Sequence, residues 1–470
     1  VLVINNVVLI NAKIPSESME NTIMAGDRII SVNDTAIAGV KMDQSEIMRR
    51  LRGKRGTMVR LGVVRRGIAE VLYFDVKRDK IPLNTIDAAY MIRPQVGYIR
   101  IGSFGAYTYK EFMDAVKKLN KEGMKNLILD LQENGGGYML SATQIVNEFL
   151  GKNDLIVYTE GRNDRRREYH ADGNGKLRKI KVVVLVNEFS ASASEIVSGA
   201  LQDQDRGVIV GRRTFGKGLV QRPIEFPDGS MMRLTIAHYY TPSGRCIQKP
   251  YTKGNAVDYN KDIDTRYKHG EFYSADSIHF ADSLKYQTLR QHRTVYGGGG
   301  IMPDIFIPRD TSGVTSYFSN VVNSGMLNLY ALEYSDRNYD KLASFKTYQD
   351  LHKYLQQQPL LSDFTNYAAA KGIKKRPHLI NISGKLIEKQ IQAYIVRNFF
   401  DEAGFYPIFQ NDDITLKRAV KVLNEGKSFP VLENKNNTPN GIAQSQTNAS
   451  RGYGFLKEII YEDYIAGSLC

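Results

Sequence analysis

Tryptophan is absent from the 470 residues, and cysteine occurs only twice, as Cys246 and Cys470. Two thiols so far apart do not form the disulfide framework on which small secreted domains depend. A chain of this length buries a full hydrophobic core without such bridges and divides into roughly two to four domains. The cysteines therefore leave the redox compartment open.

Long hydrophobic runs are also missing, because no apolar stretch reaches the ~18 residues of a membrane-spanning helix. Residues 1–14 (VLVINNVVLINAKI) are apolar, but they contain three asparagines and lack both a basic start and a small-residue cleavage site. We therefore expect the sequence as given to be soluble. It begins with Val1 rather than Met, so a fragment and a processed start both fit, and a targeting signal stays open.

Acidic residues are outnumbered by basic ones, which gives a formal net charge of +14 and a pI near 9.4. Such a charge permits an acidic partner. The basic clusters at 165–167 and 374–376 are short, however, and lack the interleaved aromatic side chains that stack on bases. We expect solvated surface at these clusters and no nucleic-acid partner.

The first part of the chain predicts a small β-rich domain over residues 1–78. Alternating apolar stretches at 27–32, 57–64 and 70–76 indicate short strands, and residues 40–51 have the periodicity of a helix.

Three further regions follow this domain. From Val96 apolar strands alternate with helical stretches, which predicts an α/β core with mainly parallel pairing over 79–308. Polar segments of helical period predict a helical region over 309–430. The end of the chain is rich in Asn, Gln, Ser and Thr, which predicts a disordered tail over 431–470.

The segment VNEFSASASEI, at 186–196, marks a strand that stops, three serines that alternate with alanines, and a helix that begins. A serine at such a turn has its hydroxyl exposed at a helix N-terminus, where backbone N–H groups stabilise an oxyanion. A plain helix N-cap is the structural alternative. Glu195 has two readings as well, a functional acid or a first-turn acid that complements the helix dipole.

A second motif, GRRTFGKGLVQ at 211–221, contains Lys217 between Gly216 and Gly218. Glycine lets the backbone approach closely, so the lysine can be buried, and burial lowers its pKa until the neutral amine takes a proton from serine. Gln221 lies four residues on, on the same face in a helix or a strand, where it could orient the amine. A solvated surface lysine is the alternative.

A third motif, LDLQENGGGY at 129–138, is an apolar strand that runs into three glycines. Backbone amides freed by glycine can serve as oxyanion donors, although a simple glycine turn would look the same. A Ser-His-Asp triad is the weaker interpretation, because none of the seven histidines lies in these motifs.

Together, these motifs resemble the carboxy-terminal processing (tail-specific) serine peptidases, along with YYTPSGRCIQ at 239–248 and GGGGIMPDIFIP at 297–308. The resemblance covers about residues 25–427. It implies Ser192 as nucleophile, Lys217 as general base and Gln221 as the third member. It also implies an oxyanion hole made by Ala193 and one glycine of the pair Gly136 and Gly137. The chain departs from the family at Gln132, where arginine is usual.

The resemblance carries further expectations. It implies a crotonase-like core with a PDZ domain, an endopeptidase that cleaves proteins near exposed C-termini, and an extracytoplasmic place in the periplasm or cell envelope. Envelope association and a homo-oligomer are compatible with it. Neither a metal nor a cofactor is expected.

Two resemblances meet in the first domain. Residues 25–39 and 51–67 resemble the PDZ domains of these peptidases, but the glycine-rich loop that binds a peptide carboxylate is missing upstream. Residues 10–28 resemble instead the serine box of type I signal peptidases, with Ser18 in the nucleophile's position. No lysine strand of that family follows, so we expect Ser18 to be inert.

Two non-enzymatic alternatives remain. One is a catalytically silent binding protein on the crotonase-like fold, and the other is a PDZ scaffold that the core merely supports. The complete set of Ser192, Lys217 and Gln221 argues against the first, and the missing carboxylate loop against the second.

Overall fold

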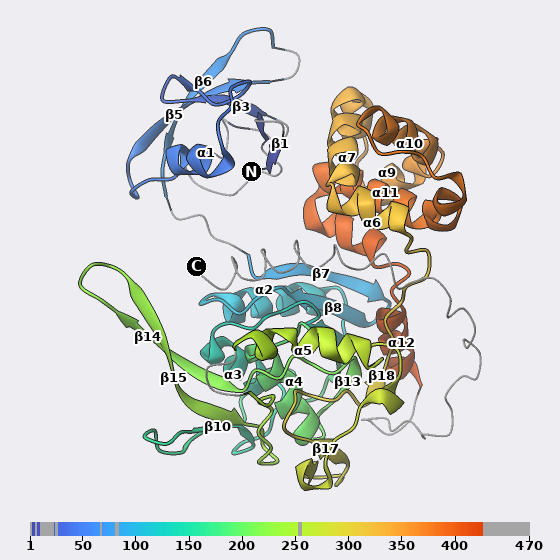
Figure 1. Cartoon of the computed structure of the whole chain (residues 1–470). Coiled ribbons are helices and arrows are strands. Elements are labelled where there is room, and N and C mark those ends of the chain that lie inside the picture. Colours follow the sequence, from blue (N-terminus) through green and yellow to red (C-terminus); the bar gives the residue numbers. More distant parts are fainter. Residues whose placement is uncertain are drawn as a thin grey trace. The chain divides into compact units, whose positions relative to one another are not determined.

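The computed structural model describes residues 2–4, 7–9, 23, 27–65, 68–79, 84–251 and 256–425 (Figure 1). Asn84–Thr311, with the segment that starts at Gln410, forms one compact unit, whereas Val1–Leu83 and Ser312–Phe409 belong to the other. The tail predicted at 431–470 lies outside the described residues. The α/β core and the helical C-terminal region are both present, which confirms these two predictions.

A six-stranded sheet forms the centre of the core, in the order β18-β13-β12-β9-β8-β7. Among its strands, β7 pairs antiparallel with β8 and the others pair in parallel. The inner strands are apolar and almost wholly buried, as expected for parallel strands covered on both faces. The strands are β7 (Ile86–Arg93), β8 (Val96–Ile101), β9 (Asn126–Asp130), β12 (Lys181–Val186), β13 (Gly207–Gly211) and β18 (Ile305–Phe306).

Helices pack against this sheet. α2 contacts β7 and β8, α4 contacts β13, and α12 contacts β9, β12 and β13. α12 stands at the end of the predicted helical region, yet it packs on the core through buried residues such as Leu416 and Val422. The helices are α2 (Thr108–Lys121), α3 (Met139–Asn147), α4 (Ala193–Asp203) and α12 (Ile414–Asn424).

A smaller antiparallel sheet has the order β11-β10-β15-β14. Its strands are β10 (Leu155–Glu160), β11 (Arg167–His170), β14 (Leu219–Glu225) and β15 (Met231–Tyr240). Figure 1 shows the hairpin of β14 and β15, in green, projecting from the core. A further helix, α5 (Ala256–Lys268), and a short hairpin of β16 (Lys285–Gln287) and β17 (Thr294–Tyr296) precede β18.

The N-terminal module is an antiparallel sheet in the order β1-β2-β3-β5-β6, with β4 beside β3. The predicted strands and the predicted helix are found as β3, β5, β6 and α1. Asp27 is 2% exposed and forms a two-pronged ion pair with Arg65, which compensates its buried charge. The elements are β1 (Leu2–Ile4), β2 (Val7–Leu9), β3 (Arg28–Val32), β4 (Thr35–Ala36), α1 (Gln44–Leu51), β5 (Met58–Val64) and β6 (Leu72–Lys77).

Six helices make up the region from Ser316 to Phe409, around a core that includes Leu351, Phe364 and Ile391. α11 is broken at Asp401, whose φ is 50°. In the described part of the chain, no helix has the length and apolar character needed to cross a membrane. The helices are α6 (Ser316–Asn323), α7 (Met326–Arg337), α8 (Tyr339–Ala343), α9 (Tyr348–Leu355), α10 (Leu360–Ala370) and α11 (Pro377–Phe409).

Candidate active site

Three loops gather at one edge of the core sheet. β9, β12 and β13 are adjacent and parallel, so the loops that follow them leave from the same edge. The loop after β9 carries the three glycines, the loop after β12 carries the alternating serines, and the loop after β13 carries Lys217. The three motifs that the sequence singled out therefore come together in space.

The serines of this loop differ in burial and in hydrogen bonding. The Ser190 hydroxyl donates to the Leu131 carbonyl oxygen at 2.7 Å, and the Ser194 hydroxyl donates to the Asn134 carbonyl oxygen at 2.9 Å. Both serines are fully buried, whereas Ser192, at the N-cap of α4, is partly exposed. The nucleophile implied by the family resemblance is thus also the accessible serine of the three.

Ser192 has a backbone conformation that is rare outside glycine, with φ 56° and ψ −113°. This conformation turns the chain sharply from the β12 loop into α4. Non-glycine residues held in such a region cluster at functional sites.

The glycine loop lies directly against this turn. A Cβ on Gly136 would come within 2.7 Å of the Ser192 Cβ and 2.9 Å of the Ala193 nitrogen, so only glycine fits. The Gly136 N–H donates to the Asn134 side-chain oxygen at 2.8 Å. The N–H groups of Ala193 and Gly137, by contrast, have no acceptor among the described residues. Those two groups remain available to an oxyanion.

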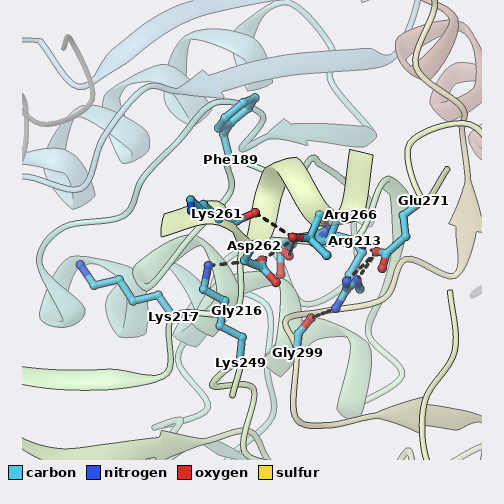
Figure 2. Close-up of polar contacts among 12 residues, drawn as sticks. Phe189, Arg213, Gly216, Lys217, Lys249, Lys261, Asp262, Arg266, Glu271 and Gly299 are labelled. Atoms are coloured by element: carbon cyan, nitrogen blue, oxygen red, sulfur yellow. Dashed lines mark hydrogen bonds and ion pairs between the residues drawn. The ribbon is translucent and has the colours of Figure 1, made fainter. Parts of the chain in front are cut away.

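Lys217 lies in the loop between β13 and β14. Burial lowers the pKa of its amine, the nearby Arg233 lowers it further, and Glu195 opposes the shift. Among the described residues the amine has no hydrogen-bond or ion-pair partner, so no hydrogen bond joins it to Ser192. In Figure 2 the Lys217 side chain extends away from the ion pair of Lys249 and Asp262.

Two motifs outside the three loops support the lysine loop. The Gln248 side-chain oxygen accepts from the Gly218 N–H at 2.9 Å, and the Lys249 N–H donates to the Gly216 carbonyl oxygen at 2.9 Å. On the other side, the Ile301 N–H donates to the Thr214 hydroxyl at 2.6 Å. The segments YYTPSGRCIQ and GGGGIMPDIFIP therefore hold the loop that carries Lys217.

Side chains of helix α5 also form hydrogen bonds and an ion pair with this loop and the adjoining segment (Figure 2). The Arg266 guanidinium donates to the carbonyl oxygens of Thr214 and Arg213, at 3.0 and 2.7 Å. Asp262 pairs with the Lys249 ammonium at 3.2 Å. Within the described chain, no cluster of three or more His, Cys, Asp or Glu side chains is arranged to hold a metal ion.

Comparison with known proteins identifies this arrangement. Residues 95–259, which span the three loops, match the profile of peptidase family S41. The part of the chain that carries the three loops is therefore similar to peptidase family S41, and we call it the S41 core. Residues 317–401, in the helical region, match a second family, DUF8443, whose function is unknown.

The relatives of the S41 core include named processing proteases. The chain is 38% identical to the carboxy-terminal processing protease CtpA of Bacillus subtilis over 253 residues, which are 52% of this chain and 53% of that protein. It is 34% identical to the chloroplastic C-terminal processing peptidase of Tetradesmus obliquus, over 48% of this chain and 51% of that protein. The chain thus spans about half the length of these relatives.

Among solved structures, the photosystem II D1 C-terminal processing protease is 31% identical, with coverage of 52% of this chain and 65% of that one and a TM-score of 0.31. The family predicted from the sequence, the carboxy-terminal processing serine peptidases, is confirmed by the family profile and the named relatives.

The S41 core contains a site residue that sequence reasoning missed. Tyr239 is 2% exposed, and its hydroxyl donates to the Lys217 carbonyl oxygen. Burial and the charge of Glu195 raise its pKa well above the usual range, while a hydrogen bond with the Ser192 side chain lowers it. Its place in the motif YYTPSGRCIQ was the available signal, but the sequence did not show what the phenol touches.

Gln221 stands apart from the other predicted residues of the S41 core. It lies on β14 opposite Thr235, its side chain is exposed, and no hydrogen bond joins it to Lys217.

Arg100 forms hydrogen bonds at the start of the glycine loop. Its guanidinium donates to the Asp130 carboxylate and to the Gln132 carbonyl oxygen, each at 3.0 Å. Ser18 lies outside the described residues.

Proposed function

We propose that the S41 core is a serine endopeptidase that cleaves protein substrates near their C-termini, with Ser192 as nucleophile and Lys217 as general base. The observation that carries the proposal is the partly exposed Ser192 at the N-cap of α4, where the N–H groups of Ala193 and Gly137 have no acceptor among the described residues. A lysine whose pKa is lowered by burial occupies the adjoining loop. The family match favours this function over a silent binding protein.

The chemistry follows from these groups. The neutral Lys217 amine takes the proton of the Ser192 hydroxyl as its oxygen attacks the scissile carbonyl carbon. The N–H groups of Ala193 and Gly137 receive the resulting oxyanion, since that of Gly136 is already bonded to Asn134. Lys217 then passes the proton to the leaving amine, and water hydrolyses the acyl-enzyme. Catalytic hydrogen bonds often tighten only when substrate binds, so the amine need not contact Ser192 beforehand.

Several parts of the proposal rest on the family alone. Gln221 would orient the Lys217 amine, the PDZ-like module would bind the substrate's C-terminal residues, and the protein would act outside the cytoplasm. Association with the cell envelope and a homo-oligomer are compatible with such a role.

The proposal is tested by incubating the protein with a disordered substrate that has an apolar C-terminus, and by sequencing the products. We expect cleavage close to the C-terminus by the wild type and none by Ser192→Ala. Undiminished cleavage by Ser192→Ala would refute the assignment.

A further inference from the structure

The carboxylate of Glu195 is fully buried and accepts four hydrogen bonds. One oxygen accepts from the Thr214 hydroxyl at 2.5 Å and from the Gly216 N–H at 2.7 Å. The other accepts from the Lys217 N–H at 2.8 Å and from the Ser192 N–H at 2.9 Å. One side chain thus binds the turn of the proposed nucleophile and the loop of the proposed base.

Helix capping accounts for only one of these bonds. A glutamate in the first turn of a helix commonly accepts from the N–H of the N-cap residue, here Ser192. The other three donors belong to the loop after β13, which has no part in capping α4. Burial raises the pKa of the Glu195 carboxyl, whereas the four hydrogen bonds favour its charged form. A residue that only capped the helix would not need its carboxylate at a position where burial disfavours the charged form.

We propose that Glu195 is a positioning residue, which fixes the Ser192 turn and the Lys217 loop to each other through a single carboxylate. This inference rests on the proposed peptidase function and deepens it. Because each oxygen binds the lysine loop, the loop cannot shift without breaking bonds to α4. The Glu195 carboxylate binds the backbone N–H groups of Ser192 and Lys217 and not the Ser192 hydroxyl or the Lys217 amine, so it acts through the two residues that it places.

The charge of Glu195 gives the proposal a specific signature. The charges of Glu195 on α4 and Arg233 on β15 act on the pKa of the Lys217 amine in opposite directions. Removing the negative charge leaves Arg233 unopposed, which lowers the pKa of Lys217. The pH at which activity reaches half of its plateau should then fall.

Three variants of the full-length chain separate position from charge. Glu195→Gln loses the charge, and its side-chain NH₂ group replaces an oxygen that accepted hydrogen bonds from the lysine loop. We expect kcat to fall by roughly 10²-fold, because small displacements of reacting groups reduce rates by about this factor. Its half-maximal pH should also decrease. Glu195→Asp and Thr214→Val keep the charge and should lower kcat without moving that pH.

Glu188 provides the matched control. It is a carboxylate 1% exposed in the same turn, but it pairs with Arg212, at the start of the lysine loop, and binds neither Ser192 nor Lys217. Glu188→Gln should change the melting temperature while kcat and the half-maximal pH stay at wild-type values.

The outcomes are distinguishable from failure of the proposed function. If wild type and Ser192→Ala both fail to cleave, the function is wrong. If the wild type cleaves through Ser192 while Glu195→Asp, Thr214→Val and any folded Glu195→Gln match its kcat and pH profile, the inference about Glu195 is overturned. Should Glu195→Gln not fold, the other two variants still decide the question of position.

Discussion

Ser192 and Ser194 show how neighbouring hydroxyls take different tasks. The Ser194 hydroxyl is buried against the Asn134 carbonyl oxygen, which fixes the glycine loop, whereas Ser192 is partly exposed. We therefore expect Ser194→Ala to lower the free energy of unfolding by about 1 kcal/mol, the usual worth of a buried hydrogen bond, and to retain cleavage. Urea unfolding and a cleavage assay measure the two quantities. Loss of cleavage at unchanged stability would instead give Ser194 a part in the chemistry.

Lys217 should set the pH dependence of the reaction. Its amine is a base only when neutral, and burial lowers its pKa. Activity should therefore be low in acid and rise with pH to a plateau, with a midpoint below the ~10.4 of a free lysine. The pH profile of kcat/KM measures this midpoint.

Lys217→Arg is the matched variant, because it keeps a cation that cannot deprotonate in a protein. It should fold like the wild type by circular dichroism and show no turnover. Full turnover by Lys217→Ala would exclude the lysine as base.

At the scale of elements, the sequence was enough to predict the loops but not their contacts. Buried parallel strands followed by SASAS, GKG and NGGG segments indicated where chemistry-bearing loops begin, and β9, β12 and β13 bring those loops to one edge. Hydrogen bonds such as that from Thr214 to Glu195 join separate loops. They depend on the order of strands in the sheet, which the sequence did not specify.

Gln221 shows the limit of reasoning from periodicity. Its spacing of four residues from Lys217 predicted that the two side chains lie on the same face. In the structure, however, Gln221 is exposed on β14, an edge strand of the smaller sheet. If it still orients the amine when substrate binds, Gln221→Ala should lower kcat by about 1–3 kcal/mol in activation free energy, with KM unchanged. Steady-state kinetics separate the two parameters. A raised KM at constant kcat would indicate substrate binding instead.

At the scale of the whole molecule, the candidate site lies within the S41 core, and the N-terminal module lies in a separate unit. The sequence predicted the β-rich character of that module from alternation alone. It could not settle the origin of the segment around Ser18, because two family likenesses overlap there.

Ser18 should have no catalytic role. No lysine that resembles the signal-peptidase base follows it in the sequence, so the sequence identifies no general base for its hydroxyl. We expect Ser18→Ala to cleave the C-terminal substrate at the wild-type rate, measured beside Ser192→Ala as the inactive control. Cleavage of a signal peptide that survives Ser192→Ala and disappears in Ser18→Ala would make the chain a double protease.

The left-handed backbone of Ser192 implies that the residue needed for activity lowers the thermal stability of the protein. A serine in that conformation costs roughly 1–3 kcal/mol, which glycine would not incur. Ser192→Gly should therefore melt at a higher temperature than the wild type in calorimetry while being inert. A lower melting temperature would mean that the turn is not strained. If the proposed peptidase function holds, such a variant would bind its substrate without cleaving it, and would serve as a stable trap for the natural targets.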